Sequence, residues 1–448
     1  MPLEIVLGGI GVLGLFGVIT VVFGPADRAA RRALVTGIIL MPLLPLNGAI
    51  PSAIVIGFGA ILLSFVAAIL KSHPRPRRMS IVVSALLVLV GMRVSTYFTE
   101  GNIGLLASAL TVILCLGIFV VGRLTEDDIL ALATAFSVVM VLHIAYATLE
   151  VSLRIPGIWP MSDGSNEITQ RAHEILPWLP GRPMTSFSHP IPLAYFMLVS
   201  VAFAAYAGMR KRRWQWISVF VGIAGIVLTG TRSALIALAV IVGIAFVSTF
   251  RLRRVVVIIV MIALALVVLR SQSLGNTLRL VGLGEDFSGT ASYRHRAMVS
   301  ASFPGLFNHD AGHVLFGWGT DIHWIFDTGI VPRYSSTFYF FDNQFVASMA
   351  QFGLFGLLLL AVALVLAFAY GNSLARMLVG ALVAMSFSFD GLTHFVGLFS
   401  FVLLIGLASV KRADESAQEP VELAADSSAL PTRVRGYADR PARRRPLA

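Results

Sequence analysis

Charged residues are scarce in this chain of 448 residues. They make up 13% of it, whereas hydrophobic residues make up 57% and the mean hydropathy is +0.85. A soluble globular domain carries about a quarter charged residues, so this composition excludes that class. The one cysteine, Cys115, lies in an apolar run, which excludes an intrachain disulfide framework and a cysteine-based zinc site. Walker, Rossmann and HExxH patterns are also absent.

Long apolar runs are abundant instead. They cover residues 3–23, 33–44, 50–70, 81–90, 103–121, 129–149, 187–206, 214–228, 234–250, 255–269, 345–368, 374–389 and 395–410. A helix needs roughly 20 residues to cross a bilayer, so most of these runs span it, the shorter ones with their flanking residues. The run 33–44 ends in two prolines and is either a full span or a broken one. We therefore predict an all-α polytopic membrane protein with about 12–13 transmembrane helices and a large external loop.

Basic residues gather in alternate loops. The clusters are Arg28/Arg31/Arg32, Lys71/Arg75/Arg77/Arg78, Arg210/Lys211/Arg212/Arg213, Arg251/Arg253/Arg254 and Lys411/Arg412. The positive-inside rule places these loops in the cytoplasm and loops 151–185, 229–233, 270–342 and 390–394 outside. The net charge of +11 then reflects membrane topology and requires no nucleic-acid partner. All three lysines lie in the predicted cytoplasmic loops, and the basic residues of the external loops are all arginines. Either the external site requires arginine, or the genome favours arginine throughout the chain; the two explanations are equal.

The two ends of the chain differ. The first apolar run has no basic segment before it, so we expect a retained anchor rather than a cleaved signal peptide. Residues 413–448 are rich in Ala, Pro, Ser, Glu and Arg without apolar periodicity, which predicts a disordered cytoplasmic tail. We therefore expect a transmembrane domain over residues 1–412 that carries the external loops 151–185 and 270–342.

Acidic residues avoid the middle of the predicted spans. Ion-coupled transporters usually place Asp or Glu at membrane depth, so the pattern argues against a proton or sodium relay. Asp390, near His394, is the exception to keep in view.

Two polar groups precede or join predicted spans on the external side. Arg182 and His189 come just before an apolar helix, whose free N–H groups favour an anion. Arg232 lies in a tight turn between two spans, which suits binding a phosphate. The alternative for His189 is a helix cap. The alternative for Arg182 and Arg232 is that their apolar stems lie along the bilayer while their charged groups reach the membrane interface.

Two further groups belong to the polar stretch 270–342 and its end. Arg294, His295 and Arg296 precede a Gly-Trp-Gly segment, and this basic cluster suits phosphate oxygens; a solvated amphipathic helix is the alternative. Asp342 and Asn343 lead into an apolar helix with Gly353 and Gly356. Asp342 is either a general base or a simple helix N-cap, and the glycines also allow close helix packing.

The order of these groups resembles the O-antigen ligase and O-antigen/exopolysaccharide polymerase family of membrane glycosyltransferases. Residues 182–195 resemble the family's Arg-x-x-Gly-Thr-Phe-x-x-Pro-Asn-x-Leu-Ala-x-Tyr region, with His189-Pro190 as a variant. Thr231-Arg232-Ser233 resembles its Ser-Arg helix start, residues 292–319 its arginine loop and Gly-x-Gly, and residues 342–356 the helix that closes the loop. Ligases of the family carry His-Asn where this chain has Asp342-Asn343, and polymerases more often carry Asp-Asn.

The resemblance implies a GT-C-like fold and a polyprenyl-diphosphate-linked glycan donor, with a glycan or lipid acceptor, in the cytoplasmic membrane of a bacterium. It implies that Asp342, Arg232 and Arg294 are catalytic, with Asp342 as general base and the arginines on the diphosphate, since guanidinium groups bind phosphate in bidentate fashion. The expected substrate-binding residues are Arg182, His189, Arg296, Asn343, His313 and His323, with His295 as a further candidate. No metal ion or cofactor is expected. The function expected first is a polymerase of lipid-linked repeat units; a ligase is the alternative, and a transporter or flippase of lipid-linked sugars is the second.

Overall fold

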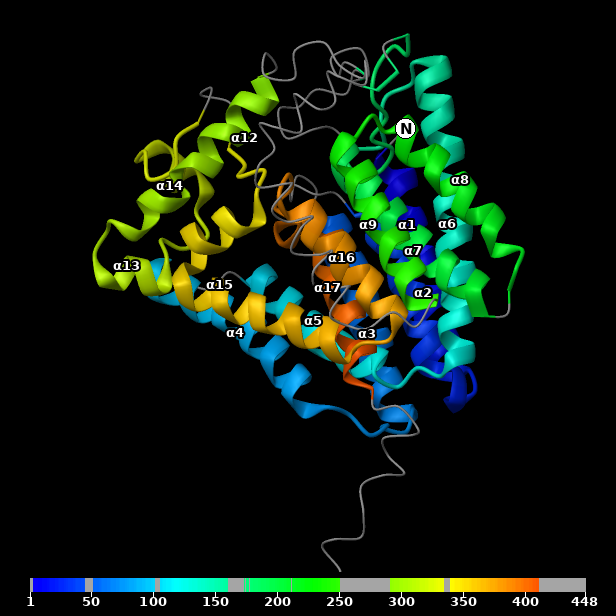
Figure 1. Ribbon diagram of the computed structural model, residues 1–448. Helices are drawn as coiled ribbons and strands as arrows, with labels where there is room; N and C mark the ends of the chain where they lie inside the picture. Colours follow the sequence, from blue (N-terminus) through cyan, green and yellow to red (C-terminus); the bar gives the residue numbers. More distant parts are fainter. Residues whose placement is uncertain are drawn as a thin grey trace, which may run out of the picture. The chain divides into compact units, whose positions relative to one another are not determined.

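The computed structural model describes residues 3–44, 51–100, 105–159, 173, 175–176, 178–210, 212–249, 291–333 and 339–410. Within these ranges the chain is built from helices, and its only β pairing is an isolated bridge between Arg77 and Val410 (Figure 1). The predicted all-α polytopic fold is confirmed. Residues up to Val410 form one compact unit, and the predicted tail 413–448 lies outside the described residues.

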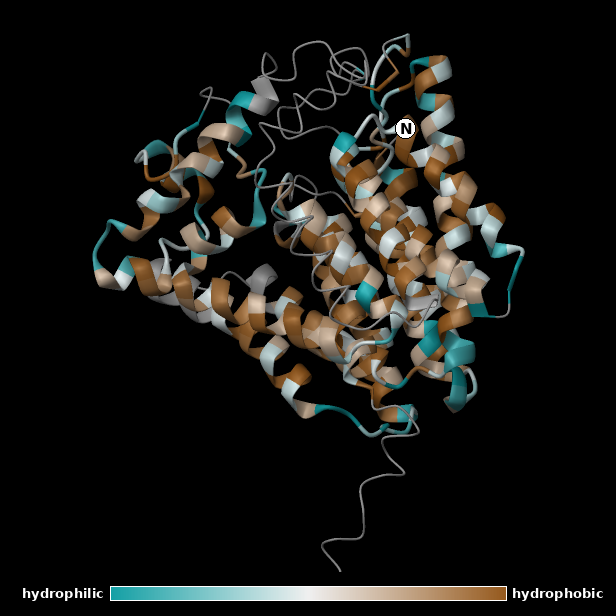
Figure 2. Cartoon of the chain, in the orientation of Figure 1, coloured by the Kyte–Doolittle hydropathy of each residue, from teal (hydrophilic) through white to brown (hydrophobic). Residues whose placement is uncertain are grey.

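Twelve of the thirteen predicted apolar runs are helices in the described part of the chain, and the run 255–269 lies outside it. They are α1 (Leu3–Phe23), α2 (Ala29–Leu40), α3 (Pro51–Lys71), α4 (Met79–Glu100), α5 (Leu105–Val121), α6 (Glu126–Leu153), α7 (Pro190–Arg210), α8 (Gln215–Leu228), α9 (Arg232–Thr249), α15 (Gln344–Tyr370), α16 (Ser373–Ser386) and α17 (Phe395–Ser409). Five of them, α1, α3, α6, α7 and α15, are long and apolar enough to cross a membrane unaided (Figure 2).

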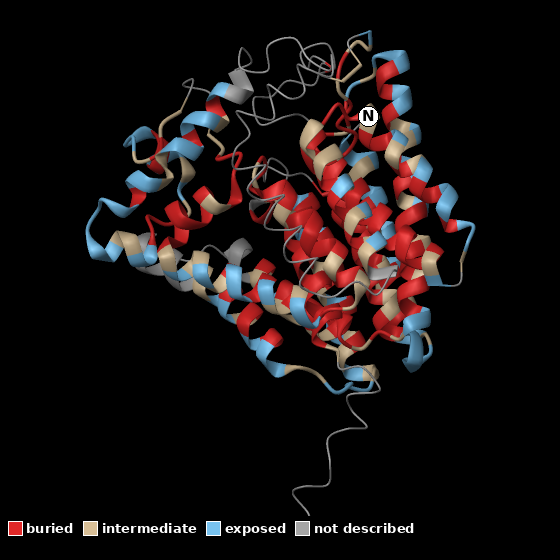
Figure 3. Ribbon diagram, in the orientation of Figure 1, coloured by how far each residue is buried: buried red, intermediate tan, exposed pale blue. Residues whose placement is uncertain are grey.

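The helices differ in how much of their apolar surface other helices cover. The apolar window of α7 is 100% buried, because α6, α8, α9, α16 and α17 pack around it. The window of α1 is only 22% buried, against α2 and α3. That of α15 is 39% buried, and exposed positions run along this helix (Figure 3). An apolar helix that stays this exposed is typical of a protein surrounded by lipid.

One end of the bundle collects arginine and lysine side chains on the free carbonyl groups of helix C-termini. Lys71 Nζ donates to the carbonyl of Val22 in the last turn of α1 and to that of Gly24 just after it, at 2.6 and 2.7 Å. Arg78 Nη1 donates to Tyr370 at the end of α15 and to Val410 after α17. Cations at these positions also complement the helix dipole.

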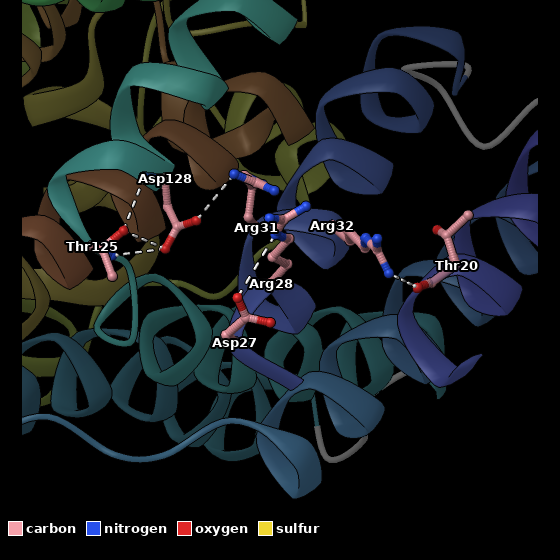
Figure 4. Close-up of polar contacts among 7 residues, drawn as sticks. All are labelled: Thr20, Asp27, Arg28, Arg31, Arg32, Thr125 and Asp128. Atoms are coloured by element: carbon pink, nitrogen blue, oxygen red, sulfur yellow. Dashed lines mark hydrogen bonds and ion pairs between the residues drawn. The ribbon is translucent and has the colours of Figure 1, made fainter. Parts of the chain in front are cut away.

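The start of α2 lies at this same end, which we call the basic end. The Arg31 side chain lies 3.5 Å from Asp128 at the start of α6, and Arg32 donates to the Thr20 carbonyl in α1 (Figure 4). A short 3-10 helix, η2 (Met41–Leu43), extends α2, and the Ser186 hydroxyl, on the chain before α7, donates to the Pro42 carbonyl. The run 33–44 therefore reaches from the basic end to the opposite end of the bundle.

The opposite end carries a helical module with a hydrophobic core of its own. Its elements are α12 (Ala291–Ser302), η5 (Phe303–Phe307), α13 (Ala311–Phe316), α14 (Ile322–Asp327) and the first turns of α15. Val299, Leu306, Phe326, Phe341 and Met349 form the centre of this core. We call residues 291–333 and 339–350 the loop module, and the end of the bundle that carries it the site end. The predicted polar loop is thus a folded unit; its first residues, up to 290, lie outside the described part.

Candidate functional site

Asp342 lies at the junction between the loop module and α15. Its side chain is 9% exposed, and its backbone has a φ of 50°, in the left-handed region that few non-glycine residues adopt. The next residue, Asn343, caps α15, because its Oδ1 accepts from the backbone N–H groups of Phe345 and Val346 at 3.0 and 3.2 Å. The alternative that Asp342 is the N-cap is therefore wrong, and its carboxylate serves another purpose.

The arginine that faces this carboxylate is Arg296 on α12. Its Nε lies 3.4 Å from Asp342 Oδ2. Arg294, two residues earlier on the same helix, is exposed. The structure therefore brings Arg296, rather than the catalytic candidate Arg294, against Asp342.

The proton affinity of Asp342 is unusual for an aspartate. Burial raises its pKa from 3.8 to about 7, with Asp390 acting in the same direction; Arg296 and Arg182 oppose the rise. A carboxylate accepts protons from a substrate most effectively when its pKa lies near the working pH. Asp342 therefore has the electrostatic character of a general base or acid, and perturbed groups of this kind concentrate at functional sites.

Arg182 comes to this site from the segment before α7. Its Nε donates to the Thr229 carbonyl and its Nη2 to Thr231 Oγ1, each at 3.0 Å. Gly230, with φ of 66°, lets the turn approach closely, since a Cβ there would lie 3.1 Å from Arg182 Cγ. The Arg182 segment and the turn at residues 229–231, which are separate in the sequence, are thus joined by hydrogen bonds. Arg232 begins α9 directly after this turn.

The chain between Arg182 and α7 is strained and held by a buried carboxylate. Thr185 and Ser188 have φ values of 51° and 54°. Glu150, near the end of α6 and fully buried, accepts from the backbone N–H of Thr185 at 2.9 Å and from that of Met184 at 3.2 Å. Strain of this kind persists where the surroundings determine it strongly, often at functional sites.

The helix after this turn starts at a histidine cap. His189 Nδ1 accepts from the Ile191 N–H at 3.2 Å, as the capping alternative for His189 requires. Its predicted role in substrate binding stays a prediction.

A second acidic group, Asp390, lies close enough to Asp342 to act on its pKa. Asp390 precedes η6 (Gly391–Thr393), is 4% exposed, and lies 3.9 Å from His394 Nε2. Burial lowers the pKa of His394, and Asp390 opposes this shift. The Gln344 side chain accepts from the Leu392 N–H at 2.7 Å, which ties this turn to the start of α15.

The other histidine candidates occupy the loop module. His295 is fully buried, its Nε2 lies 2.7 Å from the Phe340 carbonyl, and burial lowers its pKa. His313 bonds to Asp310 and stacks on Trp318, and the ring of His323 lies 4.1 Å from that of Tyr339. The contact with Phe340 places His295 beside the segment that carries Asp342, whereas His313 and His323 lie on α13 and α14.

The glycine motifs fasten the module to the bundle. Gly353 breaks the helical geometry of α15, with φ of 64° and ψ of −168°. The carbonyls freed before this break, those of Ala350 and Gln351, accept from the N–H groups of Trp318 and Gly319 at 2.8 and 3.1 Å. A side chain on Gly317 or Gly353 would collide with the opposite backbone at 2.4 Å. Gly317 and Gly353 are therefore required because the chain after α13 and the broken turn of α15 pack backbone against backbone.

Together these groups form a buried acid–base site lined by arginines, at one end of a bundle of apolar helices. In the described residues we find no group of three or more His, Cys, Asp or Glu side chains placed to hold a metal ion. The arrangement suits a substrate with an anionic group and a hydroxyl, because guanidinium groups bind phosphate oxygens and a carboxylate accepts the hydroxyl proton. It defines a multi-pass membrane protein with a buried acid–base site at one end of its bundle.

The comparison with known families identifies the class more closely. Residues 217–361 match the family model described as O-antigen ligase, so the chain carries a domain of the O-antigen ligase family and the resemblance is confirmed for this segment. No curated protein matches the chain. The matched segment contains Arg232, Arg296 and Asp342; Arg182 and Asp390 lie outside it and join the site through the fold.

Proposed function

We propose that the protein transfers a glycan from a polyprenyl-diphosphate donor to an acceptor hydroxyl, with Asp342 as general base. The observation that carries this proposal is the buried carboxylate of Asp342, whose pKa burial raises to about 7. Arg296 lies 3.4 Å from it, and Arg182 acts on the same pKa. The domain of the O-antigen ligase family supports glycan transfer in a membrane.

The proposed step is a substitution at the anomeric carbon of the donor glycan. The acceptor oxygen forms the new glycosidic bond while the bond to the diphosphate oxygen breaks, and that oxygen leaves with the electron pair. Asp342 takes the hydroxyl proton, and Arg296, Arg182 and Arg232 stabilise the negative charge of the diphosphate. Preorganised donors of this kind typically accelerate a reaction by about 10²–10³-fold each.

We infer that the acceptor is a further lipid-linked glycan, so that the protein polymerises repeat units. The support is Asp342-Asn343, where ligases of the resembling family carry His-Asn. A ligase that moves a finished glycan to a lipid or protein is the second candidate, and the description of the matched family favours it. Transport of lipid-linked sugars without chemistry is the third.

One assay separates these candidates. Purified protein in detergent is supplied with a lipid-diphosphate oligosaccharide, alone and with a second acceptor, and the products are resolved by size and by label. Longer glycans on the donor lipid support a polymerase, transfer to the second acceptor supports a ligase, and absence of any new bond contradicts the proposed chemistry. We expect the reaction to continue in the presence of a chelator of divalent cations, because arginines carry the charge of the leaving group.

Two neighbouring arginines on α12 sharpen the assignment. We expect Arg296→Ala to lower the transfer rate by about 10²–10³-fold, the cost typical of removing a charge-stabilising donor. Arg294→Ala, on the exposed side of the same helix, provides the matched comparison. If Arg294→Ala is the more damaging substitution, then the sequence-based assignment to Arg294 holds and the assignment to Arg296 is wrong.

A further inference from the structure

The end of α13 is fixed at a defined point along α15. A Cβ built on Gly353 would lie 2.4 Å from the carbonyl group of Leu315 and 2.5 Å from the backbone N of Phe316. The ring of Phe316 lies 6.3 Å from that of Phe355, less than one turn further along α15. The position of Leu315 and Phe316 relative to the span therefore follows from the position of Gly353.

The surroundings of α15 change at this same point. From Val346 to Gly353 every residue is buried, because the loop module and the bundle cover the helix. Beyond Gly353 large apolar side chains become exposed, with Phe355 at 46%, Leu358 at 55% and Val365 at 65%. This exposed apolar side of a membrane-spanning helix faces lipid.

The distance to the basic end gives the depth. Tyr370 closes α15 there, with the Arg78 guanidinium 5.4 Å from its ring, and tyrosine with arginine is typical of a membrane interface. At about 1.5 Å per residue, the helix from Gly353 to Tyr370 is about 26 Å long. The hydrocarbon core is about 30 Å thick. A tilt of α15 shortens its reach across the bilayer further. Gly353 therefore lies no further out than the outer edge of the hydrocarbon on the site side.

The side chains at this depth are apolar and exposed. Leu315 is 45% exposed and Phe316 is 46% exposed. The polar residues of α13 lie at its other end, where Asp310 caps the helix and bonds to His313. The apolar end of α13 thus continues the lipid-facing side of α15.

We propose that Leu315 and Phe316 insert between the acyl chains of the membrane leaflet on the site side, beside Phe355 and Leu358. The loop module then rests on the lipid surface by the end of α13. This contact holds the module at a fixed height above the bilayer. The inference concerns the protein's interaction with lipid and does not depend on the proposed glycan transfer.

Spin-label accessibility tests this placement in the full-length protein. With Cys115 replaced by Ala, single cysteines are introduced as Leu315→Cys and Phe316→Cys, labelled with a nitroxide, and reconstituted into lipid vesicles. Oxygen, which concentrates in the bilayer, and a water-soluble nickel chelate compete as relaxing agents. We expect both sites to favour oxygen, as Leu358→Cys on α15 does, whereas Asn308→Cys, on the exposed η5–α13 connection, favours the nickel chelate.

A measurement on the unsubstituted protein avoids any effect of the label on folding. Vesicles containing a lipid with a photoactivatable diazirine high on its acyl chain are irradiated, and the adducts are located by mass spectrometry. We expect adducts on Leu315 or Phe316 and none at Asn308. Preference for the nickel chelate at both sites, or exclusion of both relaxing agents together with absence of lipid adducts, overturns the proposal; the second outcome means that protein covers this surface.

Discussion

At the scale of single residues, the decisive property is the cost of ionising Asp342 in a buried position. Its pKa near 7 lies above the ordinary value of 3.8, so the folded protein binds this proton more tightly than the unfolded chain. The stabilising contribution of the protonated group is complete below about pH 4 and is lost as the pH rises through 7. Three units of pKa correspond to about 4 kcal/mol, an upper bound for this single group. Function at neutral pH therefore opposes stability at this residue.

Asp342→Asn tests both the catalytic role of this residue and its effect on stability. Asparagine has the same shape and also accepts the left-handed φ of 50°. We expect its transfer rate to fall by about 10²–10⁴-fold, the usual contribution of a general base. We also expect the fall in melting temperature that the unmodified protein shows between pH 5 and pH 8 to become smaller in the variant.

The pH dependence of the unmodified enzyme provides the matching observation. Because the base must be deprotonated, kcat/KM rises with pH and its acid limb has a midpoint near 7. Full activity of Asp342→Asn, or an acid limb near pH 4, contradicts the role of Asp342 as a base with a raised pKa.

The sequence identified most of the residues that meet here, but not which of two neighbours points inward. Asp342, Arg182 and the turn at Arg232 stand out because they interrupt apolar runs. Arg294 and Arg296 are equivalent in sequence, and only the packing of α12 against Phe326 and Phe341 buries His295 and directs Arg296 to Asp342. The positions of charged residues in the sequence do not show which face of α12 points towards Asp342.

At the scale of elements, the break in α15 determines where the loop module sits. The sequence indicated Gly353 only as a small residue that permits close packing, since the partner backbone is distant in sequence. Glu150 does not stand out in the sequence for a related reason: at the end of an apolar run it resembles any interfacial acid. Its hydrogen bonds to residues 184 and 185 depend on how α6 and α7 pack.

Gly353→Ala tests the importance of this break. The substitution puts a Cβ 2.4 Å from the Leu315 backbone and imposes a φ of 64° on alanine. We expect a loss of at least about 2 kcal/mol of stability from strain and collision, because each strained backbone position alone costs about 1–3 kcal/mol. Thermal unfolding in detergent measures this loss, and the transfer assay should show reduced activity.

A second glycine provides the control for Gly353→Ala. Gly243, inside α9, has open space around the position of a Cβ. Gly243→Ala should leave stability unchanged or raise it by up to about 1 kcal/mol, since alanine favours helices. Equal effects of the two substitutions would show that the backbone crossing at Gly353 is unimportant.

At the scale of the whole molecule, the two ends of the helix bundle differ chemically. Lys71, Arg78 and Arg123 satisfy helix carbonyls at the basic end, while the site end carries the loop module and the buried acids. Arginine and lysine next to apolar spans are retained in the cytoplasm, so this asymmetry predicts the orientation. Asp342 would then face the outer side of the membrane, where the transfer we propose takes place.

Labelling with a membrane-impermeant maleimide checks this orientation in intact spheroplasts. In a protein with Cys115 replaced by Ala, Asn308→Cys reports on the site end and His73→Cys on the basic end, and both positions are exposed. We expect Asn308→Cys to react at once and His73→Cys to react only after the membrane is permeabilised. The reverse pattern would place the acid–base site in the cytoplasm, where a donor still on the cytoplasmic leaflet would be the substrate. The positive-inside argument and the external location of transfer would then be wrong together, because both rest on the basic end.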